Sequence, residues 1–245
     1  MRQTLFEITS NRRLAGEDIY ELCLAGDTGA ISAPGQFVNL RLDGFYLRRP
    51  ISVCDWAEGR LTLIYKVLGR GTAAMTAYPA GRKLDVLTGL GNGYDMEKSG
   101  MAPLLVGGGV GVPPLYGLAK RLAERGVRAH AVLGFNRAAD RFLCAEFAAL
   151  GVPVTLTTVD GSAGLRGFVT DGMAAAGDYS YVYTCGPEAM LKAVYAASRT
   201  SGQFSFEERM GCGFGACMGC SCQTKYGARR ICRDGPVLEK EEIVW

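Results

Sequence analysis

Short apolar runs separated by turn residues fill the chain from residue 1 to about residue 98. Each run is long enough for one strand, and pieces such as Ala25–Asp27 and Ala57–Gly59 supply the turns. Several short strands at this spacing predict a small antiparallel barrel or sandwich. The strand-like runs are Thr4–Ile8, Ile19–Leu24, Phe37–Leu42, Ile51–Trp56 and Leu61–Val67, and one short helix is predicted at Thr72–Tyr78.

The pattern changes between residues 99 and 200, where strand-like runs alternate with helical ones. This alternation predicts a second domain, a doubly wound parallel sheet. The predicted strands are Pro103–Val106, Ala129–Gly134, Val154–Thr158 and Tyr181–Thr184, and the predicted helices are Pro113–Arg125, Cys144–Leu150 and Pro187–Ser198. Residues 201–245 form a third, cysteine-bearing segment, which begins with the strand-like run Gln203–Phe206.

Composition narrows the class of protein. Of 245 residues, 48% are hydrophobic and 21% charged, which is ordinary for a globular protein. The net charge of +3 is too small to indicate nucleic-acid binding. No apolar run approaches the length of a membrane span, and no signal peptide opens the chain. Together with thiols such as Cys23, Cys54 and Cys144, these features lead us to expect a cytoplasmic protein without a membrane partner.

Five of the nine cysteines lie close together near the C-terminus. Cys212, Cys217, Cys220 and Cys232 have the spacing C-x4-C-x2-C followed by one distant cysteine, which is typical of a plant-ferredoxin-type [2Fe-2S] cluster. Glycines between the first three cysteines let backbone N–H groups approach the sulfurs. Zinc and disulfides are the alternatives, but the only histidine, His130, is far away in sequence. Cys222 is a surplus thiol that competes with Cys220 as the third ligand.

Two glycine-containing turns lie where predicted strands run into predicted helices. The first contains Gly107, Gly108, Gly109 and Gly111, and the second is Cys185-Gly186-Pro187. Backbone N–H groups at such a turn can hold a diphosphate, although a tight structural turn is the alternative. The first turn does not match G-x-G-x-x-G. Both turns are expected at the carboxyl edge of the sheet, where dinucleotides bind.

Two weaker anion signals lie in the first domain. Arg48 and Arg49 precede an apolar strand, so they can meet a phosphate at its start, although adjacent arginines are more often solvated charge. Gly69–Thr72 offers backbone N–H groups at the start of the predicted short helix.

The order of these motifs resembles the ferredoxin–NAD(P)+ reductase superfamily, in which an antiparallel FAD-binding barrel precedes an NAD(P) domain. Arg49-Pro50-Ile51-Ser52 matches the flavin motif. The resemblance implies that Arg49 contacts the FAD diphosphate and that Ser52 lies near the reactive edge of the flavin. Many members have a stacking tyrosine where this chain has Ile51. Further FAD-contacting positions match Tyr65, Lys66, Val67, Gly71 and Thr72, and Cys185 corresponds to a cysteine near the nicotinamide.

The C-terminal pattern, which ends in Cys232–Val237, resembles the electron-transfer subunit of class 1B dihydroorotate dehydrogenase. A close relative, the small subunit of NADH-dependent ferredoxin:NADP+ reductases, typically has aspartate where this chain has Cys212. The resemblance implies an iron–sulfur flavoprotein of pyrimidine biosynthesis. Its electrons would pass from the FMN of a separate dihydroorotate dehydrogenase subunit through [2Fe-2S] and FAD to NAD+, in a heterotetramer of two of each subunit.

Other functions remain open from the sequence. A ferredoxin-, sulfide- or hydrogenase-linked NAD(P)H reductase subunit would use the same cofactors with a different partner. A zinc-binding interaction module with an incidental nucleotide fold would not be an enzyme. The choice between NAD and NADP is also open, because Arg137, beside Asn136, is compatible with a 2′-phosphate but is more typical of surface charge. The family resemblance favours NAD.

Overall fold

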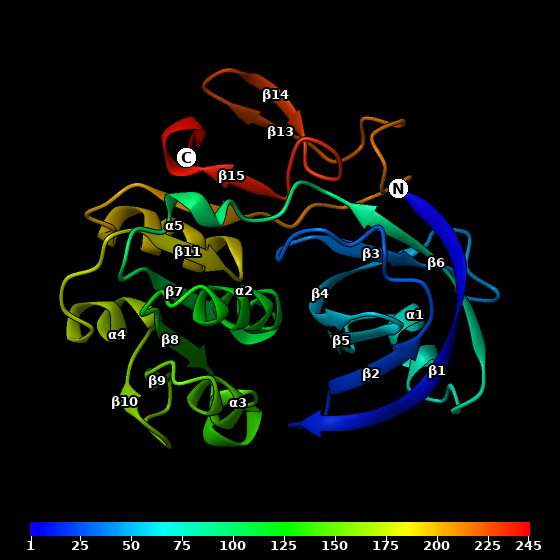
Figure 1. Cartoon of the computed structure of the whole chain (residues 1–245), viewed down its shortest axis with the longest axis horizontal. Helices are drawn as coiled ribbons and strands as arrows, with labels where there is room; N and C mark the ends of the chain where they lie inside the picture. Colours follow the sequence, from blue (N-terminus) through cyan, green and yellow to red (C-terminus); the bar gives the residue numbers. More distant parts are fainter.

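A computed structural model describes the whole chain, residues 1–245, and its N-terminal part is a closed antiparallel barrel, drawn on the right in Figure 1. The strand order around the barrel is β1-β2-β5-β4-β3-β6. The strands are β1 (Arg2–Ala15), β2 (Ile19–Ala25), β3 (Phe37–Leu40), β4 (Arg49–Ala57), β5 (Arg60–Lys66) and β6 (Lys83–Leu90), and the short helix α1 (Arg70–Met75) follows β5. The predicted barrel is confirmed.

The barrel forms because alternate residues of its strands share one apolar interior. In β3, for example, Val38 and Leu40 point into the barrel core, while Phe37 packs on its outer side. The sequence analysis missed β6, which closes the barrel by pairing with both β1 and β3. The alternating pattern of β6 is present in the sequence, since Leu84 and Val86, two residues apart, both enter the barrel core.

The second part is a seven-stranded sheet with the order β10-β9-β8-β7-β11-β12-β15. All neighbouring strands are parallel except the last pair. The strands are β7 (Leu104–Gly108), β8 (His130–Phe135), β9 (Val154–Thr158), β10 (Leu165–Arg166), β11 (Val182–Cys185), β12 (Gly202–Ser205) and β15 (Val237–Glu239). The predicted parallel sheet is confirmed, and it extends past residue 200, because β12 and β15 come from the segment assigned to the cysteines.

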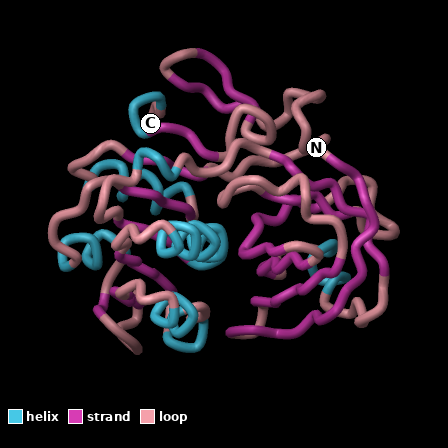
Figure 2. The backbone as a smooth tube through the Cα atoms, in the orientation of Figure 1, coloured by secondary structure: helices cyan, strands magenta, loops and turns pink.

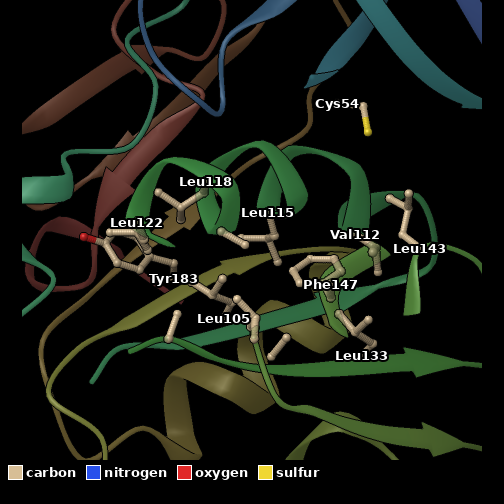
Figure 3. Packing of buried hydrophobic residues seen from close by; sticks show 14 of the residues in the cluster. Cys54, Leu105, Val112, Leu115, Leu118, Leu122, Leu133, Leu143, Phe147 and Tyr183 are labelled. Atoms are coloured by element: carbon tan, nitrogen blue, oxygen red, sulfur yellow. The ribbon is translucent and has the colours of Figure 1, made fainter. Parts of the chain in front are cut away.

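Helices cover both faces of this sheet (Figure 1). They are α2 (Val112–Glu124), α3 (Cys144–Ala149), α4 (Val169–Ala175) and α5 (Glu188–Ala197). In β7, Leu105 packs into the apolar cluster under α2 and α3, whereas Leu104 and Val106 pack into the cluster under α4 and α5. Figure 3 shows the first cluster, in which Leu115, Leu118 and other labelled residues of α2 meet the sheet. The strands are apolar on both faces because both faces are covered.

Helix α2 also holds the barrel against the sheet. A Cβ atom on Gly117 would lie 2.6 Å from the carbonyl oxygen of Cys54 in β4, so the two backbones are in direct contact. The guanidinium of Arg121 lies 3.6 Å from the centre of the Trp56 ring, and Lys120 pairs with Asp55 at 2.7 Å. These contacts fix the orientation of the barrel relative to the sheet.

The cysteine-bearing segment projects from the junction of the two parts (Figure 2). After β12 the chain forms a loop without regular structure, then the hairpin of β13 (Ser221–Thr224) and β14 (Gly227–Arg230), and returns to the sheet as β15. The remaining short elements are the 3-10 turns η1 (Met96–Lys98), η2 (Gly109–Gly111), η3 (Ala138–Asp140) and η4 (Lys240–Glu242). None of the helices has the length and apolarity needed to cross a membrane.

Candidate functional site

A cavity of about 1580 Å³ opens between the barrel and the carboxyl edge of the sheet. The cavity lies next to β7, where the strand order reverses. From β7 the chain runs outward through β8, β9 and β10 on one side of the sheet, and β11 lies on the other side of β7. Open parallel sheets bind dinucleotides at this position because loops from adjacent strands part there. The cavity brings together most of the predicted nucleotide-binding residues, namely Arg49, Pro50, Ile51, Ser52, Tyr65, Lys66, Gly71, Thr72, Gly108, Gly109, Gly111, Cys185, Gly186 and Pro187.

Arg49 and Gly71 form a cationic corner on the barrel side of the cavity. The Arg49 guanidinium lies 5.0 Å from the centre of the Phe45 ring. A Cβ atom on Gly71 would lie 2.3 Å from Arg49 Nε, so the glycine leaves room for the guanidinium in this position against α1. The arrangement presents a guanidinium beside backbone N–H groups, which suits the diphosphate of a nucleotide.

Thr72 shapes the loop at this corner. Its hydroxyl accepts hydrogen bonds from the backbone N–H groups of Leu68 at 3.0 Å and Gly69 at 3.2 Å. The side chain therefore fixes the turn between β5 and α1, and through it the position of Gly71. The sequence analysis placed Thr72 among the flavin contacts, and the structure adds this role in ordering the loop.

The strand residues of the predicted flavin motif form the wall next to the corner. Ser52 lies opposite Phe37 in the pairing of β4 with β3, and both line the cavity. Lys66 pairs with Asp18 at 3.4 Å. The Tyr65 hydroxyl donates to Asn11 Oδ1 at 3.2 Å, and burial raises the pKa of this phenol well above its usual range.

Two predicted residues do not line the cavity. Val67 packs against the barrel core and is not part of the cavity lining. Gly107 lies under helix α2, where a Cβ atom would meet Leu115 and Val112 at 3.0 Å. Both residues help pack the elements that carry neighbouring cavity residues. Val67 packs in the barrel next to Lys66, and Gly107 packs under α2 next to Gly108.

On the sheet side, the two glycine turns touch each other. A Cβ atom on Gly111 would lie 2.1 Å from the carbonyl oxygen of Cys185, so the start of α2 packs directly on the second turn. Met190 of α5 lies against both turns, since Cβ atoms on Gly108 and Gly186 would come within 2.5 Å of its side chain. The absence of side chains at these glycines lets the two turns and Met190 pack directly on one another, which brings both turns to the same part of the cavity. Backbone N–H groups at such a turn can hold a diphosphate.

Cys185 lies at the end of β11, beside Ser205 and Glu207. Desolvation raises the pKa of its thiol to about 12, although a hydrogen bond with Ser205 opposes the shift. The group is therefore a neutral thiol at neutral pH. It can donate a hydrogen bond in the cavity without adding charge.

Sequence reasoning missed other residues of the cavity because their motifs are not local. Phe37 comes from β3, and Phe206, Glu207 and Glu208 come from the chain after β12. Asn136 and Arg137, which the sequence analysis considered for a 2′-phosphate, line the cavity too, and Arg137 Nε donates to Asp140 Oδ1 at 3.0 Å.

The four predicted cluster ligands lie in two pairs. Cys212 and Cys217 form the first pair, in which the backbone N–H of each residue donates to the sulfur of the other at 3.4 Å. Cys220 and Cys232 form the second pair, in which Cys232 N–H donates to Cys220 Sγ at 3.4 Å. No three His, Cys, Asp or Glu side chains gather into a set that would hold a single metal ion. Two pairs suit a binuclear cluster with two thiolates on each iron better than one tetrahedral zinc site.

The two pairs differ in their surroundings. Cys217 is exposed, whereas Cys220 and Cys232 are each only 2% exposed and belong to the apolar cluster that includes Phe37. Desolvation opposes ionisation of Cys212, but N–H donors from the loop, among them Phe214 and Cys217, outweigh it and lower the pKa of Cys212 to about 6. The loop therefore already stabilises a thiolate at this position, the form in which cysteine ligates iron.

Cys222 packs against the same apolar cluster as Cys220 and Cys232 but makes no hydrogen bond to either. It is half-buried in β13, opposite Arg229 of β14, and burial raises the pKa of its thiol. None of its hydrogen bonds joins it to another cysteine. The contact of Cys220 with Cys232 supports the choice of Cys220 over Cys222 as the third ligand, which stays a prediction.

The barrel, the sheet and the paired thiols define an electron-transfer oxidoreductase, a reductase of the FAD- and NAD(P)-binding fold that also carries an iron–sulfur centre. Residues 207–244 match a family model described as the iron–sulfur cluster binding domain of dihydroorotate dehydrogenase B. The chain is 46% identical over 241 residues to the dihydroorotate dehydrogenase B (NAD(+)) electron transfer subunit of Shouchella clausii (strain KSM-K16), with 93% of each chain covered. It is 41% identical over 259 residues to the subunit of the same name from Bacillus mycoides (strain KBAB4), with 100% of each covered. The chain belongs to this family of electron transfer subunits.

Solved structures agree with the assignment of the fold. A structure of an NADH-dependent reduced ferredoxin-NADP oxidoreductase contains a chain with a TM-score of 0.90 and 31% identity, and the match covers 99% of this chain and 90% of that one. A cytochrome P450 reductase from Amycolatopsis, with a TM-score of 0.71 and 24% identity, shares the fold over 80% of this chain and 65% of its own.

Replacing Cys220 with serine is expected to abolish or strongly reduce the iron content, whereas Cys222→Ser should leave iron content and the visible and electron-paramagnetic spectra nearly unchanged. The reason is that only Cys220 is paired with Cys232. Iron analysis of anaerobically purified variants makes the comparison. The reverse result would make Cys222 the third ligand and change the register of the loop.

Gly111→Ala is expected to raise the KM for NADH by at least about tenfold. The new methyl group would push the start of α2 away from the backbone of Cys185 and open the second turn. Losing one charged contact to the nucleotide, roughly 1.5 kcal/mol, corresponds to about that factor. FAD content should stay normal, since the barrel side of the cavity is untouched. Steady-state kinetics and flavin absorbance measure the two effects. An unchanged KM in a variant that retains its flavin would show that the contact has no role in nucleotide binding.

Proposed function

We propose that this chain carries electrons from the FMN of a dihydroorotate dehydrogenase catalytic subunit to NAD+, through a [2Fe-2S] cluster and FAD, in the de novo synthesis of UMP. One observation supports this role above the others. The buried pair Cys220 and Cys232 shares an apolar cluster with Phe37, and Phe37 also lines the nucleotide cavity. The apolar cluster that contains Cys220 and Cys232 therefore extends to the wall of the nucleotide cavity.

FAD, when bound, exchanges a hydride with NAD+ on one side and single electrons with the iron–sulfur cluster on the other. The residues of this chain position and insulate these groups. Arg49 and the N–H groups near Gly71 hold the flavin diphosphate on the barrel side. The turns at Gly108–Gly111 and Cys185–Pro187 hold the pyridine nucleotide on the sheet side. Burial of Phe37, Cys220 and Cys232 keeps water out of the region between cavity and cluster.

The pair of Cys212 and Cys217, of which Cys217 is exposed and Cys212 partly exposed, suits the side of the electron path that faces the partner subunit. Phe214 and Met218 lie in the cluster loop and are 44% and 54% exposed, next to the exposed Cys217. Exposed apolar residues at a redox loop are typical of a surface that another protein covers. The names of the relatives, which describe them as a subunit, support a separate catalytic chain. We propose that two copies of each subunit form a heterotetramer.

A second candidate is a subunit of a ferredoxin-linked NAD(P)H reductase, which the structural match to an NADH-dependent reduced ferredoxin-NADP oxidoreductase favours. The fold, the flavin and the iron–sulfur centre would be common to both functions. The identity of 46% to a dihydroorotate dehydrogenase subunit, against 31% to the ferredoxin-linked chain, supports the first candidate. Co-purification of an FMN-containing subunit would distinguish them.

The isolated chain is expected to oxidise NADH with artificial electron acceptors and to show no oxidation of dihydroorotate. The reason is that its cavity holds one flavin site and one pyridine-nucleotide site, while dihydroorotate would need the second flavin on the catalytic subunit. Stopped-flow or steady-state assays of the purified chain, with and without that subunit, make the comparison. Dihydroorotate turnover by the chain alone would refute the division of labour.

Arg49→Ala is expected to weaken FAD retention by about tenfold or more, because a charge-assisted contact contributes on the order of 1.5–3 kcal/mol. Iron content should not change, since Arg49 does not contact the cysteine loop. Arg82→Ala is the matched control, because Arg82 is a barrel arginine that pairs with Asp43 at 2.7 Å, away from the cavity. Equal loss of flavin and iron in the Arg49 variant would indicate general unfolding instead of a lost diphosphate contact.

A further inference from the structure

The outer face of β3 lies between the nucleotide cavity and the cysteine loop. Successive side chains of a strand point to opposite faces, so Phe37 and Asn39 lie on the same side, outside the barrel, while Val38 and Leu40 lie inside it. Phe37 lines the cavity and packs in the apolar cluster of Cys220 and Cys232. Asn39, two residues further along, contacts the other limb of the cysteine loop.

The contact of Asn39 with the loop is specific. Its Nδ2 donates to the carbonyl oxygen of Cys212 at 3.3 Å. A Cβ atom on Gly213 would lie 2.3 Å from the same nitrogen, and Gly213 has a φ of +78°, which strongly favours glycine. The loop is thus shaped to accept this one side chain. Among the side-chain hydrogen bonds of the loop from Gly211 to Gly219, this one alone comes from the barrel.

Asn39 is costly as a purely structural residue. Its side chain is almost completely buried, with 1% of the residue exposed, and its Oδ1 has no hydrogen-bond partner. An unpaired buried polar atom destabilises a protein, and an apolar residue of the same size would avoid the cost. The neighbouring Gln36 shows the usual arrangement, because its Oε1 accepts from Ser32 N–H and its Nε2 donates to the Gly91 carbonyl.

We propose that Asn39 is a positioning residue for electron transfer, which fixes the Cys212 limb of the cluster loop relative to the flavin-binding barrel. Asn39 acts through the backbone carbonyl of Cys212 and makes no hydrogen bond to a cysteine sulfur. Cys220 and Cys232 of the other limb belong to the same apolar cluster as Phe37 on that strand face, so β3 borders both thiol pairs. The inference rests on the proposed electron-transfer role and names the element that maintains its geometry.

The test uses the full chain loaded with FAD and cluster, and compares Asn39→Leu with Gln36→Leu. Each variant removes one buried amide that donates to a backbone carbonyl, but only Asn39 contacts the cluster loop. For Asn39→Leu, we expect cluster loss under chelation to be about two- to tenfold faster, the range for one lost hydrogen bond. We also expect a shifted electron-paramagnetic spectrum of the reduced cluster and slower reduction of the cluster by NADH. Reduction of the flavin by NADH should remain normal.

Gln36→Leu should lower the melting temperature without any of these changes. If both variants behave alike, or if Asn39→Leu changes only the melting temperature, the proposal is wrong and Asn39 is merely structural. Because these readouts use NADH and the chain alone, they stay informative even if the partner is not a dihydroorotate dehydrogenase. In that case the absence of dihydroorotate-driven reduction in the complex would overturn the proposed function without affecting the result for Asn39.

If the Asn39→Leu variant does not fold, a double-mutant cycle tests the same coupling. Gly213→Ala forces a methyl group against the Asn39 amide, and Asn39→Ala makes room for it. The backbone strain at Gly213 is the same in both backgrounds, so it cancels in the cycle. We expect Gly213→Ala to accelerate cluster loss less in the Asn39→Ala background than alone. Strict additivity of the two changes would show that the side chain and the loop are not coupled.

Discussion

The direct contact of α2 with both the barrel and the second glycine turn is the constraint on which the site depends. Gly117 in the middle of α2 touches the backbone of Cys54 in β4. Gly111, which immediately precedes α2, touches the backbone of Cys185 at the second turn. Neither contact tolerates a side chain. The same helix therefore fixes the distance between the barrel and the sheet and the distance between the two nucleotide-binding turns. A flavin and a pyridine nucleotide can meet only if both distances are set together.

The iron–sulfur loop meets a different requirement, because its thiols must serve a protein partner on one side and the flavin on the other. One pair of cysteines lies toward solvent, where loop N–H groups stabilise the thiolate of Cys212, and the other pair lies in apolar surroundings against the barrel. Arg230 supports the loop between them, since it donates to the Gly215 carbonyl at 3.0 Å and pairs with Asp234 at 3.1 Å. A cluster held in this way spans the boundary between surface and interior.

The sequence predicted the elements whose patterns are local. Alternating strands, two glycine turns and the cysteine spacing each depend on a few neighbouring residues, and the family resemblance joined them into one site. It did not predict α4, because Gly172 interrupts its helical pattern. In the fold that glycine is needed, since a Cβ atom there would lie 2.5 Å from Val132. Phe37 and Asn39 were missed for a related reason, because ordinary core residues acquire roles only from distant segments that the fold brings against them.

The path of the chain also explains why the iron–sulfur segment is not a mobile appendage. Its entry strand β12 and exit strand β15 pair with each other at the edge of the parallel sheet, so both ends of the segment belong to the nucleotide domain. From the barrel side, the amide of Asn92 donates to the Val237 carbonyl at 2.7 Å and accepts from Val237 N–H at 3.2 Å. The segment is therefore held from both domains at once. Because electrons must cross between fixed groups many times, a rigid attachment keeps that distance the same in each turnover, whereas a hinged one would require the segment to return to position each time.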